Sequence, residues 1–231
     1  MITLAEGMGR LGTETAFEVL ARAEALKQQG KDIINLGIGQ PDFRTPDHIV
    51  EAAAKALRDG AHGYTPANGI LPLREAIAGE WATRYKAEVD PGRILVVPGG
   101  KVTMFFAISM LGEKGAEIIY PNPGFPIYES VIKWTGATPV PLPLLEKNGF
   151  AFKAEDVLSR ITPKTRLIII NSPANPTGGV TPRAAIEKLA KGLEKFPNAV
   201  VMSDEIYGRI VYDKNEHVSM LEFPSLRDRL I

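Results

Sequence analysis

Apolar residues occur in short continuous blocks through the middle and end of the chain. Four of these blocks predict strands, at residues 94–97, 117–120, 166–171 and 199–202. Helical spacing of apolar residues between them predicts helices at 101–111, 126–135, 152–161 and 181–196. Strands that are apolar on both faces and alternate with helices are typical of a buried, mainly parallel sheet. Residues 138–144 predict a further strand, and the three prolines in it indicate an edge position.

The N-terminal part of the chain has a different pattern. Helices are predicted from Thr15 to Gly30, after Thr45-Pro46 as far as Gly60, and near 73–84. Glycine- and proline-rich loops separate them, and residues 1–45 do not join the strand–helix alternation. We therefore predict an arm or small-domain segment over 1–45 and a large α/β domain over 46–231.

Composition excludes several classes of function. Lys and Arg total 27, as do Asp and Glu, so no basic excess indicates nucleic acid or an anionic membrane as a partner. No apolar stretch is long enough to span a bilayer. The absence of cysteine excludes disulfides and thiolate catalysis and suits a cytoplasmic protein. The three histidines, His48, His62 and His217, lack metal-ligand spacing and are interpreted as exposed polar residues, so no metal site is predicted.

Polar and glycine residues follow each predicted strand, at the sheet edge where open parallel sheets bind ligands. Two glycines before a helix can bring backbone N–H groups close to an anion. The residues that follow the strands in chain order are Gly99-Gly100-Lys101, Phe125, Asn175, and Asp204 with Tyr207. Together they supply an anion cradle, an aromatic ring, an amide, a carboxylate and a phenol.

Each of these features also has a purely structural interpretation. The glycine pair and the Asn175-Pro176-Thr177-Gly178 segment are competent turns, and Phe125 could be a core residue. Asp204 could cap a helix, and Tyr207 could simply be packed. Because the features recur at successive strand ends of one sheet, we favour a single ligand that uses them all. Such a ligand carries a phosphate and a cationic aromatic ring.

Six segments of the chain, in order, resemble the N-terminal portion of the fold-type-I, class I/II aminotransferases, which use pyridoxal 5′-phosphate. They cover essentially the whole chain, and their joint order is far more specific than any one of them. These segments are residues 35–43 (NLGIGQPDF), 63–69 (GYTPANG), 99–101 (GGK), 120–125 (YPNPGF), 171–178 (NSPANPTG) and 203–207 (SDEIY).

The resemblance implies a role for each matching residue. Asp204 would pair with the pyridinium N–H, while Asn175 and Tyr207 would bind the ring's 3-oxygen. Phe125 would stack on the ring, at a position where many relatives carry Tyr or Trp. The phosphate would be held by Gly99, Gly100 and Lys101, mainly through backbone N–H groups, and by Tyr64 of the other subunit of a homodimer. Gly39 would lie beside the substrate carboxylate.

The resemblance also implies a fold and an activity. The fold would be a three-layer α/β/α large domain, incomplete at its C-terminus, plus the N-terminal segment. The activity would be the transfer of an amino group between an amino acid and a 2-oxo acid, as in amino-acid biosynthesis. Two alternatives stay open: a pyridoxal-phosphate-dependent carbon–sulfur lyase, and a non-catalytic or truncated chain that binds the cofactor.

The Schiff-base lysine of this family follows the strand that carries Asp204, so we expect it beyond Ile231. Two further family strands would separate that strand from 94–97, which would otherwise lose its neighbour in the sheet. We therefore expect that the chain is not a self-sufficient fold. A complementing C-terminal polypeptide would be one way to supply the missing part.

One motif favours a different cofactor and is rejected. Residues 7–12, Gly-Met-Gly-Arg-Leu-Gly, match the G-x-G-x-x-G pattern of dinucleotide-binding proteins, and Asp32 follows at about the expected distance. That motif requires a buried strand directly before it. Met1–Glu6 is too short and too weakly apolar to form one.

Overall fold

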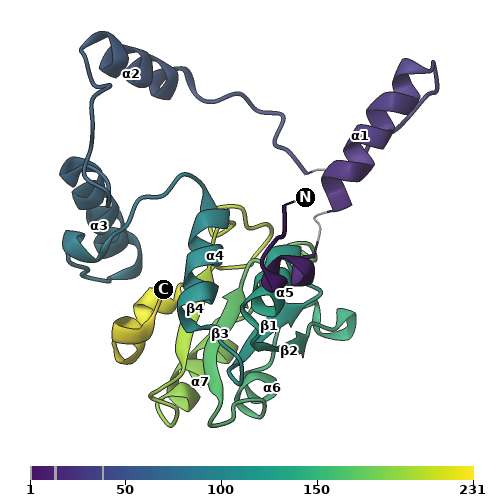
Figure 1. Ribbon diagram of the computed structural model, residues 1–231. Helices are drawn as coiled ribbons and strands as arrows, with labels where there is room; N and C mark the ends of the chain where they lie inside the picture. Colours follow the sequence, from purple (N-terminus) through teal and green to yellow (C-terminus); the bar gives the residue numbers. More distant parts are fainter. Residues whose placement is uncertain (1, 13–14, 38) are drawn as a thin grey trace.

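A four-stranded parallel sheet forms the centre of the molecule, as seen in the computed structural model of residues 2–12, 15–37 and 39–231 (Figure 1). The strands follow the order β2-β1-β3-β4, and every neighbouring pair is parallel. They are β1 (Glu117–Asn122), β2 (Thr138–Pro143), β3 (Thr165–Asn171) and β4 (Val200–Asp204). The predicted edge position of the proline-rich strand is confirmed, because β2 pairs with β1 alone.

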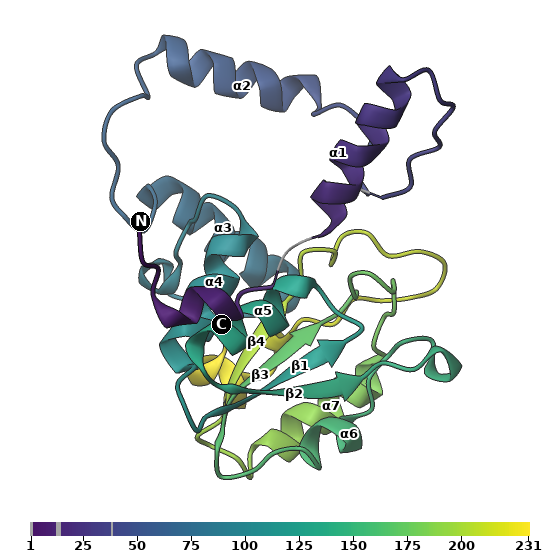
Figure 2. The ribbon, with the colours of Figure 1, turned by 45° about the vertical axis from the view of Figure 1, so that its right-hand side comes forward.

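Helices cover both faces of this sheet, which confirms the predicted three-layer α/β/α arrangement (Figure 2). Alternate side chains of β3 point to opposite faces, since successive residues of a strand do so. Leu167 and Ile169 pack with one helix pair, and Ile168 and Ile170 pack with the other. The first pair is α4 (Gly100–Leu111) and α5 (Pro126–Thr135), and the second is α6 (Ala154–Leu158) and α7 (Arg183–Leu193).

The N-terminal helices lie apart from the sheet. Helix α2 stands away from it in both views, as does α1 (Figures 1 and 2). Neither α2 nor α3 contains a buried residue. The three helices are α1 (Thr15–Gln28), α2 (Asp47–Arg58) and α3 (Leu71–Tyr85). The division of the chain at residue 45 stays a prediction.

The first short helix, η1 (Glu6–Arg10), does contact the large domain. Arg10 donates from Nε to the backbone oxygen of Lys133 at 3.0 Å and from Nη2 to that of Trp134 at 3.1 Å. A β-carbon added to Gly7 would lie 3.3 Å from the Trp134 ring. Gly7 of the G-x-G-x-x-G segment therefore lies close against α5, and residues 2–5 form no strand before the segment.

The predicted strand at residues 94–97 is wrong. This segment is extended, and Ile94 is buried, but it is outside the sheet. The free edge of β4 is occupied instead by the end of the chain, where Leu230 pairs in parallel with Val201 and Ile231 exchanges two hydrogen bonds with β4. An extended segment becomes a strand only when a neighbouring backbone can pair with it, and sequence periodicity does not report that neighbour.

The prediction that the histidines are exposed is wrong for His217. His48 and His62 are exposed, but His217 is buried beside Glu205. Short helices η4 (Met220–Glu222) and η5 (Pro224–Arg229) follow it. Within the described ranges, no helix has the length and apolarity to cross a membrane, and no three acidic, His or Cys side chains gather in a possible metal site.

Candidate active site

The carboxyl ends of three parallel strands bring distant polar residues to one edge of the sheet. Asn122 ends β1, Asn171 ends β3 and Asp204 ends β4. Asn171 and Asp204 are direct partners in the parallel register. Because parallel strands point the same way, the loops after them leave the sheet together, and the predicted site residues lie in or beside these loops.

Asp204 has a specific partner in the helical layer. Its Oδ2 accepts a hydrogen bond from the Tyr128 hydroxyl at 2.5 Å, and its Oδ1 accepts one from the Ile206 backbone N–H at 3.3 Å. Tyr128 lies on α5 and is fully buried. Burial raises the pKa of the Tyr128 phenol far above its usual range, and the Asp204 carboxylate raises it further. The phenol therefore remains a hydrogen-bond donor at all physiological pH values.

Asn171 connects two of the predicted site residues. Its Nδ2 donates to the backbone oxygen of Asp204 at 2.9 Å, and its Oδ1 accepts from the backbone N–H of Asn175 at 2.8 Å. The Asn171 side chain is buried, so both bonds form where no water competes. Sequence reasoning assigned this residue no role, although an amide that ends an otherwise apolar strand was a usable signal.

An aromatic and a basic side chain extend the cluster from α5 to α4. The Phe125 ring lies edge-on to the Tyr128 ring, with centroids 6.1 Å apart. The ammonium group of Lys101 lies 5.8 Å from the Phe125 centroid, within the range of a cation–π interaction. A continuous series of contacts thus links Lys101, Phe125, Tyr128, Asp204, Asn171 and Asn175, and we refer to these six residues as the strand-end cluster.

The start of α4 requires glycine. Gly99 is the N-cap residue, with φ of 93° and ψ of 152°, a conformation that is essentially restricted to glycine. A β-carbon added to Gly100 would meet only Met104, at 3.8 Å. Backbone conformation therefore selects glycine at 99, and space close to the helix N-terminus is open at both positions. The first N–H groups of an α-helix have no partner within it and favour an anion.

A second glycine shapes the loop that carries Phe125. A β-carbon on Gly124 would lie 2.2 Å from the backbone oxygen of Pro121, a contact that a rigid backbone cannot relieve. The loop after β1 can therefore fold back only with glycine at this position. This turn sets the position of the Phe125 ring at the start of α5.

The other predicted site residues, Tyr207, Gly39 and Tyr64, lie outside the strand-end cluster. Tyr207 is half-buried and lies three residues after Asp204, in the turn that follows β4. Gly39 and Tyr64 lie on the N-terminal segments, and Tyr64 is fully exposed. The structure therefore places Tyr207 in the turn after β4 and leaves Gly39 and Tyr64 in segments that do not pack on the sheet.

Glu205, next to Asp204, belongs to a separate buried cluster. Its Oε2 lies 3.0 Å from His217 Nε2, and its Oε1 accepts from the Ser203 hydroxyl at 2.7 Å and the Met220 N–H at 2.9 Å. Burial opposes ionisation of Glu205, but these hydrogen bonds outweigh it and lower the pKa of the carboxyl. Adjacent acids thus have different surroundings: Asp204 faces the helical layer, and Glu205 ties β4 to the returning chain.

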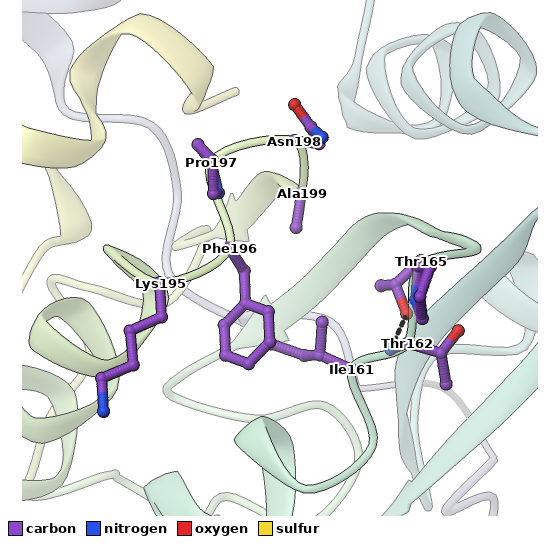
Figure 3. Close-up of a pocket in the computed structure, with 9 residues that line it drawn as sticks. Ile161, Thr162, Thr165, Lys195, Phe196, Pro197, Asn198 and Ala199 are labelled. Atoms are coloured by element: carbon purple, nitrogen blue, oxygen red, sulfur yellow. Dashed lines mark hydrogen bonds between the residues drawn. The ribbon is translucent and has the colours of Figure 1, made fainter.

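One cavity lies away from the strand-end cluster. It has a volume of about 220 Å³ and is bordered by residues 161–165 and 195–199, which precede β3 and β4 (Figure 3). Phe196 points toward Ile161 across it, and Thr165 Oγ1 accepts from the Thr162 N–H at 2.9 Å. This cavity is at the amino ends of the strands, opposite the strand-end cluster, and no predicted site residue borders it.

The chemistry available at the strand ends is consistent with one kind of ligand. An ionised carboxylate can neutralise a protonated ring nitrogen, and an aromatic side chain can stack on the ring. A glycine-capped helix N-terminus can receive a phosphate. These groups converge on one sheet edge although they come from segments up to about a hundred residues apart in sequence.

Comparison with known proteins gives a consistent result. Residues 31–230 match the family described as aminotransferase class I and II. The chain is 37% identical over 220 residues to a probable aspartate/prephenate aminotransferase of Aquifex aeolicus, covering 95% of this chain and 56% of that protein. It is 34% identical over 229 residues to the aspartate aminotransferase of Geobacillus stearothermophilus, covering 99% and 58%.

Solved structures agree. The crystal structure of an aspartate aminotransferase from Rhizobium meliloti superposes with a TM-score of 0.93 at 31% identity, covering 100% of this chain and 58% of that one. The aspartate aminotransferase of Thermus thermophilus with maleate gives a TM-score of 0.92 at 33% identity, covering 100% and 59%. The chain thus spans somewhat more than half the length of these relatives. The fold, the strand-end motifs and the matches agree that the chain belongs to the class I and II aminotransferases.

Proposed function

We propose that this chain serves an aminotransferase that moves an amino group between an amino acid and a 2-oxo acid through pyridoxal phosphate, the cofactor of this family. The observation that carries the proposal is the continuous strand-end cluster around Asp204. It assembles a carboxylate, aromatic rings and an ammonium group at the sheet edge where open parallel sheets bind ligands.

The residues present fit the cofactor. Both carboxylate oxygens of Asp204 accept hydrogen bonds within the chain, which supports its assignment as the acceptor for a ring N–H. Phe125 is half-buried, so part of its ring is free to stack on a ligand. The glycine-only conformation of Gly99 opens the N-terminus of α4 toward a phosphate. These groups are chemically compatible with a ligand that carries a phosphate and a protonated aromatic ring.

Each predicted residue has a role in the proposal. Asp204 holds the proton on the ring nitrogen, and Asn175 and Tyr207 hydrogen-bond to the 3-oxygen. Phe125 excludes water from one face of the ring. The phosphate is bound by Gly99, Gly100 and Lys101, together with Tyr64 from the other subunit of a homodimer. Gly39 lies beside the substrate carboxylate.

The chemistry divides between cofactor and protein. When bound, pyridoxal phosphate acts as an electron sink for carbanion chemistry at the substrate α-carbon. The chain's contribution is to keep the ring charged at its nitrogen, to fix its orientation and to anchor the phosphate. The family's Schiff-base lysine, expected beyond Ile231, stays a prediction.

The substrate and the cellular setting are proposed from the relatives. Several of them are named aspartate aminotransferases, which supports aspartate as the amino donor. The transfer of amino groups between amino acids and 2-oxo acids supports a role in amino-acid metabolism, in the cytoplasm. A homodimer with active sites at its interface completes the proposal.

Cofactor binding is the first test. We expect pyridoxal phosphate and pyridoxamine phosphate each to bind one site per chain, and Asp204→Ala to weaken binding at least tenfold. A matched control is Asp213→Ala, at an exposed turn outside the cluster. Equal affinity of the Asp204→Ala variant and the unaltered chain in a fluorescence titration would refute the assigned site.

Activity separates transamination from the alternatives. Incubation of the protein that carries both this chain and the Schiff-base lysine with a panel of amino acids, 2-oxoglutarate and pyridoxal phosphate should yield glutamate from aspartate faster than from other donors. Release of pyruvate and ammonia without glutamate would indicate an eliminating enzyme instead. Borohydride reduction followed by peptide mass mapping then identifies any lysine that is linked to the cofactor. Bound cofactor that is never trapped and never turned over would leave a binding function only.

A further inference from the structure

His217 is a buried histidine that the roles assigned above do not use. Its side chain is 3% exposed, and it lies on the chain that returns toward the sheet after β4. Its Nε2 is 3.0 Å from Glu205 Oε2. Although burial opposes ionisation, hydrogen bonds lower the pKa of the Glu205 carboxyl, so the carboxylate accepts and His217 Nε2 donates. The imidazole is therefore held in one orientation.

The turn that carries Tyr207 lies beside this imidazole. Residues 205–208 form the turn, which is closed by a hydrogen bond from the Gly208 N–H to the Glu205 backbone oxygen at 2.9 Å. A second turn follows, closed from the Ile210 N–H to the Tyr207 backbone oxygen at 2.8 Å. Tyr207 thus lies between two tight turns, and its position depends on how the first of them is held.

Gly208 leaves the space that the His217 ring occupies. A β-carbon added to Gly208 would lie 2.8 Å from His217 Cδ2 and 2.9 Å from its Nε2. The φ of Gly208 is outside the left-handed region, so the space taken by this ring is the main obstacle to a side chain there. His217 therefore contacts both ends of the turn, through a hydrogen bond at Glu205 and through close packing at Gly208.

The end of helix α3 confines the ring from another direction. The Tyr85 ring lies edge-on to the His217 ring, with centroids 6.0 Å apart. Arg84 Nη2 donates to the backbone oxygen of Gly208 at 2.9 Å, which fastens the same end of the turn to α3. The imidazole thus lies among Glu205, Gly208 and Tyr85, and it cannot move without displacing one of them.

We infer that His217 is a positioning residue, which fixes the turn at 205–208 and so sets where the Tyr207 phenol meets the cofactor's 3-oxygen. The inference rests on the proposed function and adds a residue to it. His217 acts through the turn and through Tyr207. Loss of the imidazole lets the turn shift, which weakens one hydrogen bond to the 3-oxygen and leaves the contacts to the ring nitrogen and the phosphate in place.

Two ligands together measure the 3-oxygen contact alone. They are pyridoxamine 5′-phosphate and its 3-deoxy analogue, which lacks this oxygen, and both bind without a lysine linkage. The readout is the ratio of their affinities, measured by calorimetric titration of the apo form of the protein that carries this chain. A general loss of stability lowers both affinities together and leaves the ratio unchanged, whereas a displaced Tyr207 lowers the ratio.

His217→Ala is the direct test, because it removes both the donor and the packing. We expect the ratio to fall roughly fivefold, as for the loss of one hydrogen bond. Tyr207→Phe should lower the ratio by a similar factor, and the double variant should fall no further than Tyr207→Phe. Leu189→Ala is the matched control: it removes a fully buried side chain from α7, away from the turn, and should leave the ratio unchanged.

The outcomes separate this inference from the proposed function. An unaltered protein that binds neither ligand, or that binds both equally, would overturn the proposed function. An unchanged ratio in Tyr207→Phe would remove Tyr207 from the proposed site, and the inference with it. A ratio that is lowered by Tyr207→Phe but not by His217→Ala would overturn the role of His217 alone, as would equal falls in His217→Ala and Leu189→Ala.

A second variant covers the case in which His217→Ala does not fold. Gly208→Ala retains the imidazole but places a β-carbon where the ring lies, so it displaces the same contact from the side of the turn. It should lower the ratio by a similar factor. An unchanged ratio in Gly208→Ala would refute the inference.

Discussion

The strand-end region and the N-terminal helices differ in how their positions are determined. Around Asp204, the residues of the strand-end cluster are held by contacts within this chain, and two of them, Tyr128 and Asn171, are buried. On the N-terminal segments, α2 has no buried residue, and Leu36, Phe43 and Tyr64 are 90%, 89% and 110% exposed. The comparison teaches that the ring and phosphate side of the proposed site is built within the chain, whereas the placement of Gly39 and Tyr64 is not.

The largest expected effect tests this difference in packing. Leu189 on α7 is fully buried, so Leu189→Ala should lower the free energy of unfolding by about 3 kcal/mol through lost burial and a residual cavity. Leu57 on α2 is 62% exposed, and Leu57→Ala should change it by less than about 0.5 kcal/mol. Urea denaturation of the protein that carries this chain measures both. Equal losses would show that α2 is as firmly packed as α7.

Glu205 should show the next largest effect, and one that depends on pH. Glu205→Gln should cost roughly 2 kcal/mol at pH 7, because hydrogen bonds to a buried charge are lost. The folded-state pKa lies below the value of 4.5 for a free side chain, so this stabilisation is present above about pH 4.5 and is lost as pH falls through the folded-state pKa.

Measuring stability against pH tests the prediction for Glu205. The unaltered chain should lose stability in acid more steeply than Glu205→Gln, and the two stability curves should converge as pH falls below the folded-state pKa of Glu205. Glu216→Gln removes a carboxylate that pairs with Arg183 at the exposed surface and should change stability by less than about 0.5 kcal/mol. Parallel curves for the unaltered chain and Glu205→Gln would contradict the assigned shift.

The two glycines at the start of α4 should respond differently to substitution by alanine. Gly99→Ala forces a side chain into a glycine-only conformation and should cost about 2 kcal/mol. It should also weaken binding of pyridoxamine phosphate about tenfold. Gly100→Ala is the matched control, because its β-carbon has space and its backbone is helical. Calorimetric titration of both variants checks this, and equal affinities would argue against a special conformation at 99.

The smallest expected effect concerns the point where the N-terminal segment contacts the large domain. Arg10→Ala removes two hydrogen bonds to carbonyl groups at the end of α5 and should cost about 1 kcal/mol. It should also make residues 2–12 more susceptible to limited proteolysis. Arg58→Ala, at the exposed end of α2, serves as the control. No change in the cleavage pattern would mean that Arg10 does not anchor this segment.

Most of the fold could be predicted from the sequence because its signal is local. The strands at 117, 166 and 199 and the helices between them follow from apolar runs and helical spacing, and all appear within a few residues of the expected positions. The strand-end loops followed from their glycines, prolines and polar residues. The segment at 94–97 has the same local pattern but no strand beside it, so the same reasoning failed there.

The sequence by itself determined a parallel α/β sheet, the loops that carry Phe125, Asn175 and Asp204, and the aminotransferase family. Only the tertiary structure decided that Tyr128 meets Asp204, that Asn171 joins Asp204 to Asn175, and that His217 is buried against Glu205. The physical reason is the range of the interactions. Periodicity and turn chemistry act over a few residues, whereas these contacts depend on how α5 and the chain after β4 pack onto the sheet.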